Sequence, residues 1–439
     1  MSFPRYPAYK EVPIPWICQV PEHWQWNPIF AAARERGEDN KGMKEDNLLS
    51  LSYGSIVNKD INTSDGLLPE SFETYQIVRL GDIVLRLTDL QNDKRSLRSA
   101  LVTQTGIITS AYLALEPKRI DSRYLNYLLR AYDVAKVFYS MGGGLRQSMK
   151  YGDIKRMPLV IPSKAEQQAI VNFLDHETAR IDALIAEQQR LIELLQEKRQ
   201  AVISYAVTKG LNPDAPMKDS GVEWLGEVPE HWEIKKLKYV SPQITVGIVV
   251  EPSKYYVDDG VPALRSLNVS QGKIRLENLV FISENANKIH EKSRLSTGDL
   301  VAVRSGQPGT TAVIESDLDG CNCVDLIIIR KPFLTSSLFL SWYLASDFAK
   351  VQFSSGSGGA IQQHFNVATA AELIIPVPPK EEQADILQTI ELRISQLDLL
   401  GSQAQQAVTL LQERRSALIS SAVTGQIDVR GLVPLEAAA

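Results

Sequence analysis

The sequence predicts an α+β protein in which two similar domains are separated by two long helices, and an internal repeat is the main reason. Pro-Glu-His-Trp at positions 21–24 recurs at positions 229–232, a shift of 208 residues. The segment LLQEKRQAVISYAVT at 194–208 recurs as LLQERRSALISSAVT at 410–424, a shift of 216 residues. Each copy is far longer than the unit of a solenoid repeat, which is roughly 20–50 residues. The chain therefore contains one domain-plus-helix unit twice.

Two stretches with almost no Gly or Pro, 164–208 and 380–424, predict the two long helices. Apolar residues recur in each at the four- and three-residue spacings of a heptad. The expected seams are Ile170, Leu174, Ile181, Leu184, Leu191, Leu195 and Val202, and Ile386, Ile390, Leu397, Leu400, Ala407, Leu411 and Leu418. At 1.5 Å per residue, each helix would span roughly 65 Å. We expect the two helices to pair as an antiparallel coiled coil, which would give the repeat a pseudo-two-fold axis.

The repeat predicts five segments along the chain. These are a first domain at 1–163, a spacer helix at 164–208, a second domain at 209–379, a second spacer helix at 380–424 and a tail at 425–439. Each domain is expected to carry a strand opening near Gly-Asp, one amphipathic helix, a Gly-rich loop and a closing strand. The expected helices are 123–139 and 336–353, and the expected loops are 142–153 and 355–366.

Composition limits the class of protein. The chain has 439 residues, of which 44% are apolar, so it can build two cores. No apolar run approaches the ~18 residues of a membrane span, and the N-terminus lacks the order of a secretory signal, so we expect a cytoplasmic protein. Cys18, Cys321 and Cys323 have neither a disulfide framework nor the spacing of a zinc site. No metal site is predicted.

The charge distribution leaves a nucleic-acid partner open. The net charge is −5, but residues 79–156 contain fourteen basic and seven acidic residues, a local net charge of +7. Such a segment could hold a phosphate backbone, and it could equally be an ordinary solvated surface.

The candidates for reading DNA bases are polar residues of the shared loop, where Gln147 aligns with Gln363 but their neighbours differ between the copies, and of the segments after the Gly-Asp strands. Gln and Asn can bond adenine and Arg can bond guanine, while Lys and Ser can hold phosphates or base edges. The glycines of the loops would allow close approach to a nucleic acid, or would simply permit a tight turn. The candidates are Arg86, Lys94, Arg95, Arg98, Arg146, Gln147 and Lys150 in the first domain, and Arg304, Ser305, Gln307, Gln362, Gln363, His364 and Asn366 in the second.

Motifs of catalysis are missing from the sequence. The run SGQPGTT at 305–311 lacks the lysine of a P-loop. The Pro-Pro at 378–379 follows Val377, where an adenine or cytosine methyltransferase would need Asn or Asp. We therefore expect no catalytic residue and no bound cofactor in this chain.

The order of domains and helices, with GDIV/GDLV, IPSKAEQQAI/VPPKEEQADI and LLQEKR/LLQERR, resembles the specificity subunit of type I restriction-modification systems. The resemblance implies two target recognition domains, each reading one half of a bipartite double-stranded DNA site. It implies that the helices dock two methyltransferase subunits, with the methyl donor and ATP bound by partner subunits, and that restriction/translocase subunits join them. The family has no fixed base-reading residues, so the candidates above come from the loops alone.

Two alternatives remain from the sequence. The chain could be a non-catalytic scaffold that binds proteins and uses the coiled coil as a ruler. It could also be a DNA-modifying enzyme with an active site of unfamiliar sequence. The basic segment and the divergent polar loops favour DNA binding over the scaffold, and the missing cofactor motifs disfavour the enzyme.

Overall fold

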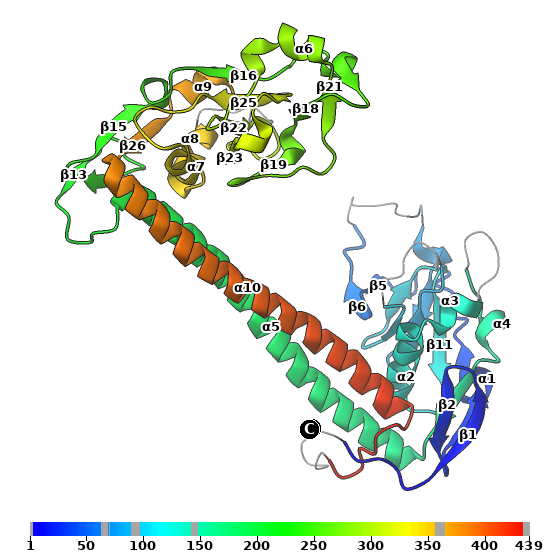
Figure 1. Ribbon diagram of the computed structural model, residues 1–439. Coiled ribbons are helices and arrows are strands. Elements are labelled where there is room, and N and C mark those ends of the chain that lie inside the picture. The colour runs from blue at the N-terminus through cyan, green and yellow to red at the C-terminus, as the bar shows by residue number, and fades with distance from the viewer. Residues whose placement is uncertain are drawn as a thin grey trace. The chain divides into compact units, whose positions relative to one another are not determined.

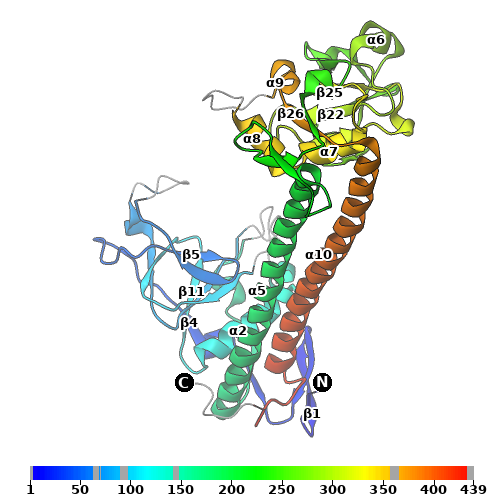
Figure 2. The same cartoon turned by 90° about the vertical axis from the view of Figure 1, so that its left-hand side faces the viewer.

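A computed structural model of the chain describes residues 3–62, 69, 71–88, 97–141, 148–355 and 365–432. The chain divides into two compact units, residues 1–189 with 406–439 and residues 190–405. Both units combine sheets with helices, which confirms the α+β prediction (Figures 1 and 2). The long helices α5 (Lys164–Lys209) and α10 (Lys380–Val423) contribute to both units.

Unit 1 is built from short strands, three short helices and the longer helix α2. Its strands are β1 (Tyr9–Ile14), β2 (Ile17–Pro21), β3 (Gln25–Pro28), β4 (Ala33–Glu35), β5 (Leu49–Ser52), β6 (Ser55–Asn58), β7 (Gln76–Val78), β8 (Ile83–Leu85), β9 (Ser99–Leu101), β10 (Gly106–Ile108), β11 (Leu113–Pro117) and β12 (Pro158–Ile161). Its helices, besides part of α5 and α10, are α1 (Ile29–Ala32), α2 (Ser122–Val134), α3 (Val137–Met141) and α4 (Tyr151–Ile154).

Unit 2 has the same kinds of element. Its strands are β13 (Met217–Asp219), β14 (Glu227–Pro229), β15 (Glu233–Lys236), β16 (Ile244–Val246), β17 (Tyr256–Val257), β18 (Val261–Leu264), β19 (Val269–Ser270), β20 (Lys273–Ile274), β21 (Val280–Ile282), β22 (Leu300–Val303), β23 (Thr311–Val313), β24 (Asn322–Cys323), β25 (Leu326–Ile329) and β26 (Ile374–Val377). Its helices are α6 (Glu284–Ile289), α7 (Ser337–Leu344), α8 (Asp347–Ser355) and α9 (Val367–Ala371).

The central sheet has the same strand order in the two units. It is β4-β11-β8-β9 in unit 1 and β16-β25-β22-β23 in unit 2, with every neighbouring pair antiparallel. The Gly-Asp motif precedes the second of the two inner strands, β8 or β22, and both glycines have φ near +90°, which favours glycine. Strands β8 and β22 are fully buried, as their continuous apolar sequences predict. The sequence repeat is therefore a repeat of topology.

The amphipathic helix predicted in each domain is interrupted. In unit 1, α2 ends at Val134 and α3 begins at Val137, because Lys136 between them has φ +60° and leaves the helical conformation. In unit 2, α7 ends at Leu344 and α8 begins at Asp347. The apolar periodicity continues across both breaks, so the pattern alone predicted one helix in place of two.

The long helices pack together as antiparallel segments within each unit. Unit 1 contains the start of α5 and the end of α10, and unit 2 contains the end of α5 and the start of α10 (Figure 1). Arg415 pairs with Asp182 at 3.3 Å in unit 1, and Arg199 pairs with Asp398 at 3.3 Å in unit 2. The 216-residue shift converts one pair into the other. The same contact is thus made twice, with the two helices exchanging roles.

The predicted seam is wrong in the middle of each helix. Leu184, Leu191 and Leu400 are 40%, 42% and 49% exposed. Ile185 and Ile192 are more buried than these leucines, and Ala404 and Val408 are buried in α10. Two apolar rows lie side by side on each helix, and both have heptad spacing. Spacing alone could not tell which row faces the partner helix.

Candidate nucleic-acid interface

The Gly-rich loop and the Gly-Asp strand of each unit meet at their ends. In unit 1, the N–H of Met149, in the second half of the predicted loop, donates to the carbonyl of Leu87, which lies two residues after β8, at 2.9 Å. In unit 2, the N–H of Phe365 donates to the carbonyl of Arg304 at 3.1 Å. Met149 and Phe365 are related by the 216-residue shift. The same backbone bond therefore brings the two predicted reading segments together in both copies.

A short helix closes each predicted loop: α4 (Tyr151–Ile154) begins inside the predicted range 142–153, and α9 (Val367–Ala371) begins directly after the range 355–366. Lys150 is the N-cap residue of α4, and its N–H donates to Asp153 Oδ2 at 2.8 Å. Asn366 is the N-cap residue of α9, and its side chain accepts from the N–H of Thr369 at 3.0 Å. Both N-cap residues are exposed. A lysine and an asparagine thus occupy the same position, as expected for a shared frame with different chemistry.

Arg98 has a structural position, so the prediction that it contacts DNA is wrong. Its side chain is fully buried. Its Nη1 donates to the carbonyls of Arg86 and Thr88 at 3.2 and 2.7 Å, and its Nε donates to the Tyr139 hydroxyl at 3.2 Å. A guanidinium held in this way cannot reach a base edge. Arg98 instead holds the chain after β8, including the half-buried Arg86.

Arg304 is also engaged within its own domain. Its Nη1 lies 2.5 Å from Asp325 Oδ1, and its side chain is 22% exposed. Ser305 and Gln307 are exposed on either side of Gly306, whose φ is +87°. The loop therefore presents these two side chains outward while Arg304 anchors its start.

Seven of the predicted DNA-contacting residues lie outside the described residues. They are Lys94, Arg95, Arg146, Gln147, Gln362, Gln363 and His364. For these residues, DNA contact remains a prediction from the sequence.

The aspartates of the two Gly-Asp motifs were missed by sequence reasoning, although their repetition was visible. Asp82 is 1% exposed and accepts from the Arg36 guanidinium at 2.7 and 2.9 Å. Asp299 is 2% exposed and accepts from Arg330 at 2.6 Å. Each also accepts the N–H of the residue three positions earlier. These buried ion pairs shape the turn that leads into β8 or β22.

A glutamate near the start of each long helix holds the Pro-Glu-His-Trp corner. Glu166 lies 2.7 Å from His23 Nε2 and 3.3 Å from Trp24 Nε1, and Glu382 lies 2.7 Å from His231 and 3.0 Å from Trp232. Trp24 and Trp232 are fully buried. Burial acts to raise the pKa of Glu166, but hydrogen bonds from His23, Ser163 and Trp24 outweigh it and hold the pKa below its usual range.

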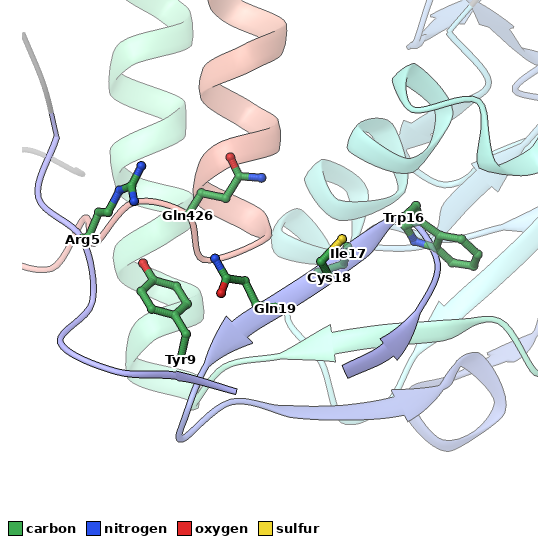
Figure 3. A pocket seen from close by; sticks show the side chains of 7 residues that line it. All are labelled: Arg5, Tyr9, Trp16, Ile17, Cys18, Gln19 and Gln426. Atoms are coloured by element: carbon green, nitrogen blue, oxygen red, sulfur yellow. The ribbon is translucent and has the colours of Figure 1, made fainter. Parts of the chain in front are cut away.

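A hollow of about 290 Å³ in unit 1 lies between the β1–β2 hairpin and the chain after α10. Figure 3 shows Arg5, Gln19 and Gln426 near one end, with Cys18 and Trp16 following β2 toward the other. The lining has one cation among amides and aromatic rings, and none of its residues was a DNA candidate. It differs from the basic lining that a phosphate backbone requires.

Metal clusters and membrane-spanning helices are both absent from the part of the chain that the structure describes. No group of three or more His, Cys, Asp or Glu side chains there could hold a metal ion. None of the described helices is both long and apolar enough to cross a membrane.

Comparison with known proteins identifies relatives along most of the chain, although no family model matches it. The MjaVIII specificity subunit of a type I restriction enzyme from Methanocaldococcus jannaschii is 26% identical over 342 residues, covering 74% of this chain and 76% of that protein. The putative type I restriction enzyme MjaX specificity subunit of the same organism is 25% identical over 438 residues, covering 94% of this chain and 96% of that protein.

A solved structure of a type I restriction-modification system, described as explaining complex assembly and conformational transition, contains a chain of the same fold. Its TM-score is 0.70 at 15% identity, and the match covers 92% of this chain and 99% of that one. The fold, the internal repeat and the named relatives agree. Over most of its length the chain is thus similar to the specificity subunits of type I restriction enzymes.

Proposed function

We propose that this chain is the non-catalytic DNA-reading subunit of its restriction-modification complex, and that each domain reads one half of a bipartite site. The observation that carries the proposal is the repeated junction of loop and strand, made by the bonds Met149–Leu87 and Phe365–Arg304. Around this junction the two copies present different polar residues, with Lys150 in one and Asn366 in the other. A common frame with different side chains is what two half-sites of different sequence require.

The paired helices would set the unread gap between the half-sites. Antiparallel pairing relates two copies by a local two-fold axis, which is also the symmetry of duplex DNA. Each domain would then read its half-site on the opposite strand. The repeated ion pairs Asp182–Arg415 and Asp398–Arg199 support this pairing.

The helices would also dock two methyltransferase subunits, which carry the methyl donor, while restriction/translocase subunits use ATP. Support comes from apolar side chains that the helix pair leaves uncovered. Seven leucines of α5 and α10 are 40–60% exposed, namely Leu184, Leu191, Leu194, Leu392, Leu399, Leu400 and Leu410. An exposed apolar row on a long helix is typical of a protein interface.

Lengthening both helices by one heptad tests whether helix length sets the gap between the half-sites. Duplicating residues 184–190 and 400–406 preserves the seam and adds about 10 Å, which corresponds to about three base pairs. Co-expressed with its methyltransferase subunit, this variant should methylate the two original half-sites separated by a gap about three base pairs longer. An unchanged gap would contradict the claim that helix length sets it. Assembly of the wild-type complex without any DNA binding would favour the protein scaffold instead.

A further inference from the structure

A small hollow in unit 1 lies where the first domain rests on the end of α10. It has a volume of about 40 Å³ and is lined by Leu97, Arg130, Ala131, Val134, Arg415, Ser416 and Ile419. Arg130 comes from α2 and Arg415 from α10, so two cations line the same hollow from different elements.

Neither guanidinium is fully satisfied by protein groups. Arg130 donates from Nη2 to the carbonyls of Gly54 and Ser99, and Arg415 pairs through Nη2 with Asp182 at 3.3 Å. The Nε atoms of both arginines are buried without a hydrogen-bond partner in the part of the chain that the structure describes. A buried donor left without an acceptor costs about 1–3 kcal/mol, so two in one hollow require an explanation.

The charge of Arg130 is also poorly compensated. Among the described residues, its recorded partners are carbonyls, and no carboxylate lies within ion-pair distance. Burial first, and then the nearby charge of Arg415, lower the pKa of the Arg130 guanidinium. Arginine nevertheless stays protonated in proteins. Of the two like charges beside the hollow, only that of Arg415 has a carboxylate partner, Asp182.

In unit 2, protein groups alone make the equivalent contact between the long helix and the domain. Arg199, the counterpart of Arg415, lies over the Trp342 ring at 5.9 Å. Gln200, the counterpart of Ser416, donates to the carbonyl of Ala345 at 2.9 Å. Ala345 comes nine residues after the helix N-cap Ser336, as Arg130 comes nine residues after the N-cap Asp121. Unit 2 therefore has a direct bond between helix and domain at the position of the hollow.

We propose that the hollow between Arg130 and Arg415 binds a small inorganic anion, chloride or orthophosphate, which joins the first domain to α10. The anion offsets the positive charge of the two guanidinium groups that line the hollow and supplies Arg130 with the negative partner it lacks. The apolar walls formed by Leu97, Val134 and Ile419 exclude larger ligands. This site does not depend on the proposed function, since it concerns how one unit is held together.

Thermal unfolding of the full-length chain provides the first test, at constant ionic strength with sodium gluconate as the bulky reference salt. Replacing gluconate by chloride or by phosphate should raise the unfolding midpoint by about 2–4 °C once the binding anion is several-fold above its dissociation constant. The better of the two anions in separate titrations identifies the natural ligand.

A double variant that copies unit 2, Arg130→Ala with Ser416→Gln, should lose this anion response. The matched control Arg199→Gln removes the equivalent guanidinium in unit 2, which pairs with Asp398, and should keep the response. An anion response that is equal in the double variant would overturn the proposal.

Chloride-35 NMR on the wild-type chain decides the matter even if the double variant does not fold. Chloride bound in the hollow should broaden the resonance, and phosphate should reverse the broadening if it occupies the same site. If neither chloride broadening nor phosphate stabilisation is observed, the hollow holds only water and the proposal is wrong.

Discussion

The two copies agree in the residues that build the frame and differ in those that face outward from it. The buried Asp82 and Asp299 make the same bonds before an inner strand, and Glu166 and Glu382 hold the same His-Trp corner. At the junction of loop and strand, by contrast, Lys150 in the first copy occupies the position that Asn366 occupies in the second. Repetition thus marks the residues that the fold needs, and divergence marks those available for distinguishing one DNA half-site from another.

The largest expected effect comes from the repeated aspartates. Asp82→Ala and Asp299→Ala should each destabilise their own unit by about 2–3 kcal/mol, because each removes a buried carboxylate that accepts from an arginine and from the backbone of the turn. The measurement is urea unfolding followed unit by unit with hydrogen exchange. Asp39→Ala, whose side chain is 68% exposed, is the control and should change stability by less than about 0.5 kcal/mol. A small effect at only one of the two aspartates would contradict the claim that they have the same structural role in the two units.

Glu166 and Glu382, which hold the Pro-Glu-His-Trp corners, should differ in how much they stabilise their units. The Glu166 side chain is 7% exposed and that of Glu382 is 27% exposed, so Glu166→Ala should cost about 1–3 kcal/mol and Glu382→Ala should cost less. Urea unfolding of the two variants at neutral pH measures the difference. Equal losses would show that burial does not distinguish the two corners.

The pH dependence of unit 1 follows from the lowered pKa of Glu166. Folding lowers this pKa below its ordinary value of 4.5, so the stabilisation is fully present above pH 4.5 and is lost as the pH falls through the folded-state pKa. Glu166→Gln should therefore reduce the loss of unit 1 stability below pH 4.5. Unfolding curves between pH 3 and 7 that are parallel for wild type and variant would contradict this assignment.

The smallest expected effects are at the outward-facing residues. Gln307→Ala should relax the recognised sequence at a position of the second half-site only, by about 1–3 kcal/mol. Lys150→Ala should weaken the complex on all sequences and reduce the salt dependence of binding by about one charge. Lys10→Ala, on the exposed β1 strand, is the matched control for loss of a lysine. Binding measured at several salt concentrations distinguishes these outcomes, and a change in the first half-site with Gln307→Ala would contradict the copy assignment.

The sequence predicted the architecture well because the repeat is long and the helices have clear periodicity. It missed the break at Lys136, since a single residue with positive φ does not disturb the apolar pattern. It placed Leu184 in the seam in place of Ile185, because both apolar rows have heptad spacing. It also selected Arg98 for DNA contact, because sequence cannot show that a long cationic side chain folds back to cap carbonyls in its own domain. Asp82 and Asp299 could have been identified as structural residues from the sequence, because the Gly-Asp motif occurs in both copies.

The most direct test of the account is a chain with two copies of the second domain, in which residues 209–379 replace residues 1–163. Co-expressed with the methyltransferase subunit, wild type should methylate one bipartite motif with two different halves, mapped across the host genome by long-read sequencing. The variant should methylate an inverted repeat of the second half-site, because each domain reads its half on the opposite strand. A direct repeat, or a motif that keeps the first half-site, would contradict the claim that each copy reads one half.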